Sequence, residues 1–65
     1  MIRRSNGFDK FVAEYYLNKN KGLIDMDKAF VLANDLWDRA AQKDKSAERL
    51  LGNLATIYNH KRELA

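Results

Sequence analysis

Hydrophobic residues recur along the chain at the three- and four-residue spacing of helices that each bury one stripe. The first such segment predicts a helix over 6–19, capped by Ser5 or Asn6, either of which can accept a hydrogen bond from a first-turn amide. At about 100° per residue, its apolar positions share one side. They are Phe8, Phe11, Val12, Tyr15 and Tyr16.

Two further segments show the same spacing. The second predicts a helix over 25–42 with Asp25 as its N-cap, and the third predicts a helix over 46–63 that is capped by Asp44 or Ser46. The second stripe consists of Met26, Ala29, Phe30, Ala33, Leu36, Trp37, Ala40 and Ala41. The third consists of Ala47, Leu50, Leu51, Leu54, Ile57, Tyr58 and Leu64.

The connections between these segments are short, which makes consecutive helices antiparallel neighbours. Proline is absent, and no stretch alternates in the way that a strand requires. We therefore expect an all-α fold, a compact up-down-up three-helix bundle in one domain over 1–65, with 1–5 as a flexible basic arm. The expected core is Phe8, Phe11, Tyr15, Phe30, Trp37, Leu50, Leu54, Ile57 and Tyr58.

Gly52 falls inside the third predicted helix, on the side away from its stripe. A glycine there costs roughly 1 kcal/mol relative to alanine. Either a close backbone contact requires it or the position tolerates it, and the sequence leaves both interpretations open.

Composition narrows the function classes. The 65 residues include no cysteine and a single histidine, so disulfides, thiolate chemistry and an ordinary structural zinc site are excluded. No apolar run reaches the roughly 18 residues of a membrane span, and no signal-peptide pattern follows Met1, which favours a cytoplasmic protein. We expect no cofactor and no small-molecule substrate.

Residue types suited to catalysis are few and isolated. Asp35 and Asp38 share one flank of the second helix, but a general acid and base pair needs a cleft that raises one pKa. His60 lies three residues before Glu63 in what we interpret as a surface end-turn. No Gly-rich phosphate loop or paired metal-ligand spacing occurs. The sequence therefore predicts a protein that is not an enzyme.

The net charge of +3 favours anionic partners without demanding one. On the outward side of the third helix a nearly acid-free polar row contains residue types that read guanine and adenine edges, and nearby cations suit phosphates. A solvated face of any basic protein has a similar composition. The candidate nucleic-acid-binding residues are Arg3, Arg4, Lys43, Lys45, Arg49, Asn53, Thr56 and His60.

Apolar residues left outside the expected core indicate a different partner. Leu17 and Val31 fall outside their stripes, and Leu32 falls at a stripe edge. Tyrosine dominates many interfaces, and Tyr16 also lies at a stripe edge. Our first hypothesis is a non-enzymatic regulator, adaptor or inhibitor that binds a partner protein or a second copy of itself; the alternative is a DNA-binding transcriptional regulator. The candidate protein-binding residues are Tyr16, Leu17, Val31, Leu32 and Asp35.

The order of several landmarks resembles that of HMG-box domains. Phe8 and Phe11 lie in the first helix, Trp37 near the end of the second, Lys45 shortly after it and Tyr58 in a long third helix. The chain lacks the prolines of that family and is shorter than its usual domain. We carry none of the family's minor-groove wedge residues onto this sequence.

Overall fold

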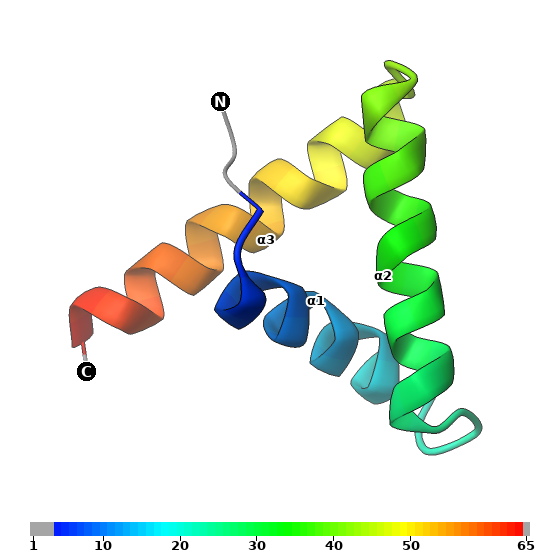
Figure 1. The fold of residues 1–65 in the computed structure, drawn as a ribbon. Coiled ribbons are helices and arrows are strands. Elements are labelled where there is room, and N and C mark those ends of the chain that lie inside the picture. The colour runs from blue at the N-terminus through cyan, green and yellow to red at the C-terminus, as the bar shows by residue number, and fades with distance from the viewer. Residues whose placement is uncertain (1–3, 65) are drawn as a thin grey trace.

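The chain folds into three helices, as its hydrophobic pattern predicts. The computed structural model describes residues 4–64, and these form α1 (Asn6–Lys19), α2 (Met26–Ala41) and α3 (Lys45–Leu64), with no strand among them (Figure 1). The predicted range of α1 matches these bounds, and those of α2 and α3 differ by one residue at each end. The all-α three-helix fold is therefore confirmed.

Each helix begins at a side chain that accepts hydrogen bonds from first-turn amides. Ser5 Oγ accepts from the Phe8 amide at 3.2 Å, and Asp25 Oδ1 accepts from the Lys28 amide at 2.8 Å. Asp44 Oδ1 accepts from the first-turn amides of α3 at 3.0 and 3.3 Å. These bonds satisfy donors that have no partner inside a helix. Ser5 and Asp44 are thus the caps that the sequence left undecided.

Both turns use backbone conformations in the left-handed region. Lys21 and Gly22 have φ values of 52° and 82° after α1, and Lys43 has a φ of 65° between α2 and α3. The Lys43 turn is closed by the Asp44 amide, which donates to the Arg39 carbonyl at 3.0 Å. After the reversal at Lys43, α3 begins beside the C-terminal end of α2 and then runs away from α2 across the molecule (Figure 1).

The core lies where the three helices meet, and its centre uses smaller residues than we expected. Phe30 and Ile57, both predicted to be buried, are 37% and 48% exposed. Phe30 lies at the edge of the α2 stripe. The small residues at the middle of that stripe make the closest contacts with the neighbouring helices. The buried residues are Phe8, Val12, Ala13, Tyr16, Ala29, Ala33, Leu36, Ala47, Leu51 and Leu54.

The C-terminal part of α3 extends past the core. Its buried residues lie between Ala47 and Leu54, and Tyr58 is the last to pack against the core. Every residue from 59 to 64 is exposed. Figure 1 shows this end of α3 far from α2. The second half of α3 therefore offers most of its circumference to a partner.

Two helical glycines have opposite surroundings. A Cβ atom built on Gly7 would lie 2.5 Å from Tyr58 Oη, so the start of α1 closely approaches α3. A Cβ atom on Gly52 would meet nothing within 4 Å. The structure therefore shows no close contact that requires glycine in the middle of α3.

Candidate nucleic-acid interface

The outward face of α3 carries the polar row that the sequence singled out. Ala47, Leu51 and Leu54 point into the core and orient the helix. At about 100° per residue, the row faces away from them. All five of its members are exposed: Lys45, Arg49, Asn53, Thr56 and His60.

Most of the row's hydrogen-bonding groups have no partner among residues 4–64. Between residues 4 and 64, ion pairs involve only Arg4 and Arg39 among the basic side chains, which leaves Lys45 and Arg49 unpaired. Thr56 differs, because its hydroxyl donates to the Gly52 carbonyl at 3.0 Å. Thr56 can therefore offer a partner only its oxygen as an acceptor, while the arginine and lysine retain their donors.

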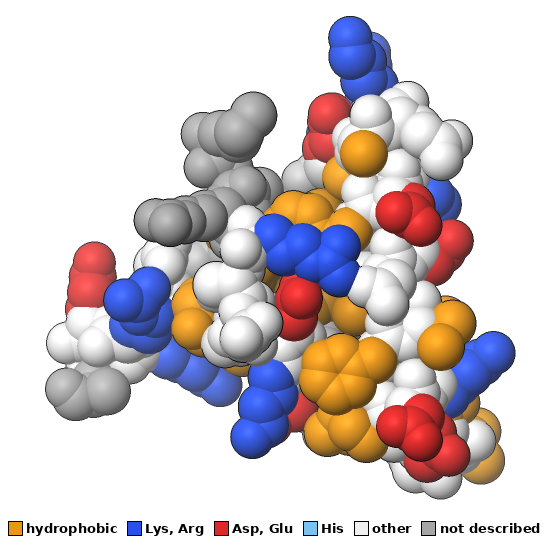
Figure 2. Space-filling view, in the orientation of Figure 1, with side chains coloured by type: hydrophobic (Ala, Val, Ile, Leu, Met, Phe, Trp, Pro, Cys, Tyr) orange, Lys and Arg blue, Asp and Glu red, His pale blue; other side chains and the backbone are white. Residues whose placement is uncertain are grey.

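Charge is distributed unevenly over the surface. The segments 1–22, 23–42 and 43–65 have net charges of +3, −2 and +2, from five basic and two acidic, two and four, and five and three residues respectively. Figure 2 shows acidic side chains gathered over α2 on the face in view. A polyanion would accordingly be attracted to the outward face of α3 and repelled by the outward face of α2.

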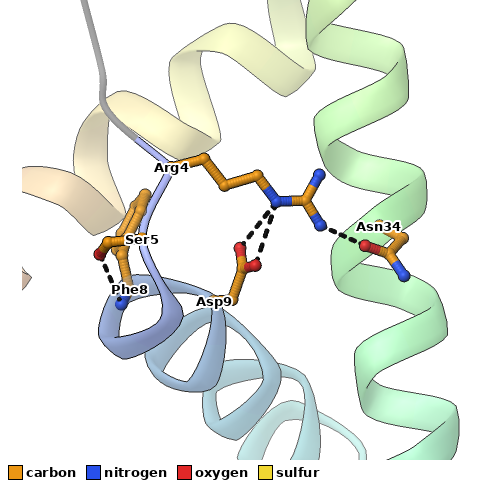
Figure 3. A network of polar contacts seen from close by, with 5 residues as sticks. All are labelled: Arg4, Ser5, Phe8, Asp9 and Asn34. Carbon is orange, nitrogen blue, oxygen red and sulfur yellow. Dashed lines mark hydrogen bonds and ion pairs between the residues drawn. The ribbon is translucent and has the colours of Figure 1, made fainter.

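Arg4 is tied to two helices and is not free to join the row. Its Nε lies 3.0 Å from Asp9 Oδ2, and its Nη2 donates to Asn34 Oδ1 on α2 (Figure 3). The guanidinium also lies 5.3 Å from the centre of the Trp37 ring. Arg4 and Ser5, placed by the sequence in a flexible arm, thus both contact the helices. Arg3, the other predicted arm contact, lies outside the described residues.

Lys43 occupies the turn directly before α3. Its side chain is exposed, and its backbone has a left-handed conformation. It lies two residues before the first member of the row in sequence. Its predicted role as a phosphate contact remains compatible with this position.

The residues predicted to bind a protein do not form one surface. Tyr16 is only 8% exposed, while Leu17 and Leu32 are partly buried against the core. Asp35 Oδ2 accepts a bond from Arg39 Nε at 2.9 Å. Val31, at 57% exposed, is the one exposed apolar side chain of the set. Leu17, which the sequence places outside its stripe, is partly buried because α1 contacts both other helices, and these contacts widen its buried arc beyond one stripe.

Burial also changes the acidity of Tyr16. Removal of its phenol from water raises its pKa above the ordinary value of 10.0, although the nearby positive charge of Arg39 acts in the opposite direction. An ionised phenolate at this position is therefore disfavoured.

Two basic residues near the C-terminal end of α3, on the side turned away from the row, are not among the residues predicted from the sequence. Lys61 Nζ lies 5.3 Å from the centre of the Phe11 ring, and the Arg62 guanidinium lies 5.7 Å from that of Tyr58. The spacing of four between Tyr58 and Arg62 is a signal that the sequence contains. The contact between Lys61 and Phe11 joins α3 to α1 and has no local signal.

The chain matches no protein-family model, no curated protein and no solved structure. The resemblance to HMG-box domains is therefore limited to the order of a few landmarks. No family activity is transferred to the site, and its function has to be argued from its own geometry.

Two structural findings complete the description of the site. Within residues 4–64, no helix combines the length and apolar character needed to cross a bilayer. The same residues contain no cluster of three or more histidine, aspartate or glutamate side chains arranged to hold a metal ion.

The dimensions of α3 suit a groove in duplex DNA. An α-helix with its side chains is about 10–12 Å across, and the major groove is about 12 Å wide. From Lys45 to His60 the row extends about 22 Å at 1.5 Å per residue. Arginine can pair with guanine through two hydrogen bonds, and asparagine can do so with adenine. Arg49 and Asn53, which lie four residues apart on this face, have the chemistry for such contacts.

Proposed function

We propose that the chain is a non-enzymatic DNA-binding regulator that places the outward face of α3 in the major groove. The observation that carries this proposal is the exposed row on that face, in which Lys45 and Arg49 have no ion-pair partner between residues 4 and 64. Arg49 and Asn53 contact base edges, and Lys45 and Lys43 contact phosphates at the start of the helix.

The same geometry favours DNA over a partner protein that would bind the five predicted protein-binding residues. A protein-binding patch requires apolar and aromatic anchors at its centre. The core instead contains Tyr16, and Leu17 and Leu32 pack against it. Val31 is exposed on α2, which carries several acidic residues. The row on α3, by contrast, combines cationic and amide groups, as direct readout of DNA requires.

Fluorescence anisotropy with a labelled duplex tests the proposal. The purified chain is titrated into mixed-sequence DNA at about 50 and about 200 mM salt, because contacts with phosphates release counterions and lose affinity steeply as salt rises. We expect measurable binding at the lower concentration and a marked loss at the higher one. An absence of binding at about 50 mM salt would refute the proposed function.

A matched pair of variants tests the role of the row. Arg49→Ala removes one positive charge from the row, and Lys10→Ala removes one from an exposed position on α1. Loss of a good two-bond base contact costs about 1–3 kcal/mol, so Arg49→Ala should weaken binding by roughly 5- to 150-fold. Lys10→Ala should change affinity by no more than about twofold, because salt screens the interaction between DNA and a charge far from the interface. Circular dichroism verifies that both variants fold, and equal effects of the two would exclude the row as the interface.

A further inference from the structure

We infer that the methyl group of Thr56 contacts the C5-methyl group of a thymine in the major groove, an inference that rests on the proposed DNA-binding function. Thr56 has no role in the contacts proposed above. As a specificity-determining residue it adds a preference for thymine to the preferences of Arg49 for guanine and of Asn53 for adenine.

Thr56 lies near the middle of the polar row on α3. At about 100° per residue, it is turned about 20° from Arg49, whose direction is the middle of the row, and about 60° from Asn53. Thr56 and Asn53 are three residues apart and therefore neighbours on the helix surface. Their separation along the helix axis is about 4.5 Å, little more than the distance of about 3.4 Å between stacked base pairs. When Asn53 reaches an adenine, Thr56 therefore faces the same base pair or the next one.

The hydroxyl group of Thr56 is engaged inside the helix. It donates to the Gly52 carbonyl, one turn earlier, at 3.0 Å. A hydroxyl group has a single proton, so this bond leaves Thr56 without a donor for the O4 oxygen of thymine or for the acceptors of guanine. The bond also selects one rotamer of a side chain that is stiff at χ1, and so fixes the position of the methyl group. The methyl group is therefore in place before DNA binds.

Open space adjoins the Thr56 side chain. Thr56 is exposed, and its neighbour one turn earlier is a glycine. Nothing lies within 4 Å of the position that a Cβ atom would take on Gly52. The methyl group of a base consequently has room beside Thr56 without displacing another side chain. Burial of an apolar group of this size changes affinity by about fourfold.

Replacement of thymine by uracil tests the contact, because it removes only the C5-methyl group of the base. The original chain first selects its binding site from a pool of random duplexes at about 50 mM salt. Each thymine of the selected duplex is then replaced in turn by uracil, and affinities are measured by fluorescence anisotropy. We expect one of these replacements to weaken binding of the original chain by about fourfold.

Two variants of similar shape separate the methyl group from the hydroxyl group. Thr56→Ser keeps the hydroxyl and loses the methyl, so it should bind the duplexes with thymine and with uracil at the sensitive position equally well. Thr56→Val keeps a methyl and loses the hydroxyl, so it should retain the preference for thymine. The control Val31→Ala removes methyl groups from an exposed position on α2 and should leave the preference unchanged. Circular dichroism verifies that each variant is folded.

The oxygen of Thr56 is the competing contact, because it can still accept a bond from an amino group of adenine or cytosine. In that case Thr56→Val would lose affinity for the selected duplex while Thr56→Ser would keep it. This result would overturn the inference, since Thr56 would then act through its oxygen.

The remaining outcomes distinguish this inference from the proposed function. An absence of binding at low salt refutes both. If the chain binds but enriches no sequence, or if no thymine of the selected site is sensitive to uracil, Thr56 does not contact a thymine methyl. The same conclusion follows if the sensitivity is unchanged in Thr56→Ser. In these cases the proposed function is judged separately, by its salt dependence and by Arg49→Ala.

Discussion

Gly7 offers a quantitative test of how α1 meets α3. Replacement by alanine would place a Cβ atom 2.5 Å from Tyr58 Oη and 3.6 Å from Tyr58 Cζ. The phenol cannot easily withdraw, because its ring centre lies 5.4 Å from that of Phe8 and 5.4 Å from that of Phe11. The substitution must therefore displace α1 or disturb the aromatic cluster.

Two opposing terms set the size of the effect. Forcing extra atoms into a packed site typically costs about 1–3 kcal/mol. Alanine is better than glycine in a helix by roughly 0.5–1 kcal/mol, which offsets part of that cost. We expect Gly7→Ala to lower the free energy of unfolding by about 1 kcal/mol, which corresponds to roughly 4–8 °C in Tm for a domain of this size.

Gly52 provides the matched control for this change. The same substitution there meets no atom within 4 Å, so Gly52→Ala should stabilise the protein by roughly 0.5–1 kcal/mol. Tyr58→Phe removes the oxygen that Gly7→Ala would approach. In that background the substitution at Gly7 should lose its penalty and become neutral or slightly stabilising.

Urea denaturation followed by circular dichroism measures all of these differences. The coupling between Gly7→Ala and Tyr58→Phe should be about 1 kcal/mol or more, as found for residues in direct contact. The reasoning is refuted if Gly7→Ala stabilises as much as Gly52→Ala does. It is also refuted if the penalty at Gly7 is unchanged when Tyr58 is phenylalanine.

Two further predictions concern the core. Leu36→Ala should lower the free energy of unfolding by about 2–5 kcal/mol because Leu36 is fully buried. Ile57→Ala, at a half-exposed position, should lower it by less than about 1 kcal/mol. Similar losses for the two variants in urea denaturation would contradict the placement of the core. Burial raises the pKa of Tyr16 in the folded chain above its ordinary value of 10.0, so its contribution to stability is complete below pH 10 and is lost as pH rises through the folded value. As pH rises through that range, the free energy of unfolding should fall more steeply for the original chain than for Tyr16→Phe. Parallel pH profiles for the two proteins would show that Tyr16 does not titrate in this way.

Local features of the fold were predictable because their causes lie within a few residues. The stripes in the sequence set the helix bounds to within one residue, and Ser5, Asp25 and Asp44 cap the helices through side chains next to their first turns. The outward row of α3 follows from the same periodicity, since a stripe that faces the core dictates which residues face away. That part of the candidate site needed no tertiary information.

Contacts between helices determine which residues of each stripe are fully buried and which stay partly exposed. Periodicity identifies the side of a helix that is buried, but the residue at the centre of that side depends on how closely neighbours approach. Ala29 and Ala33 allow a close approach to α2, so Phe30 is left at the edge and stays partly exposed. Tyr16, which the sequence places at a stripe edge, is likewise buried, near Arg39 and Asp35 of α2.

The sequence by itself determined three helices, their caps and a polar outward face on α3, because all of these depend on spacing and on bonds within a turn. Only the tertiary structure decided that Arg4 bridges α1 and α2 and that Lys61 lies over Phe11, fifty residues away along the chain. Each of those contacts depends on the separation of two helices, and no short stretch of sequence encodes that distance.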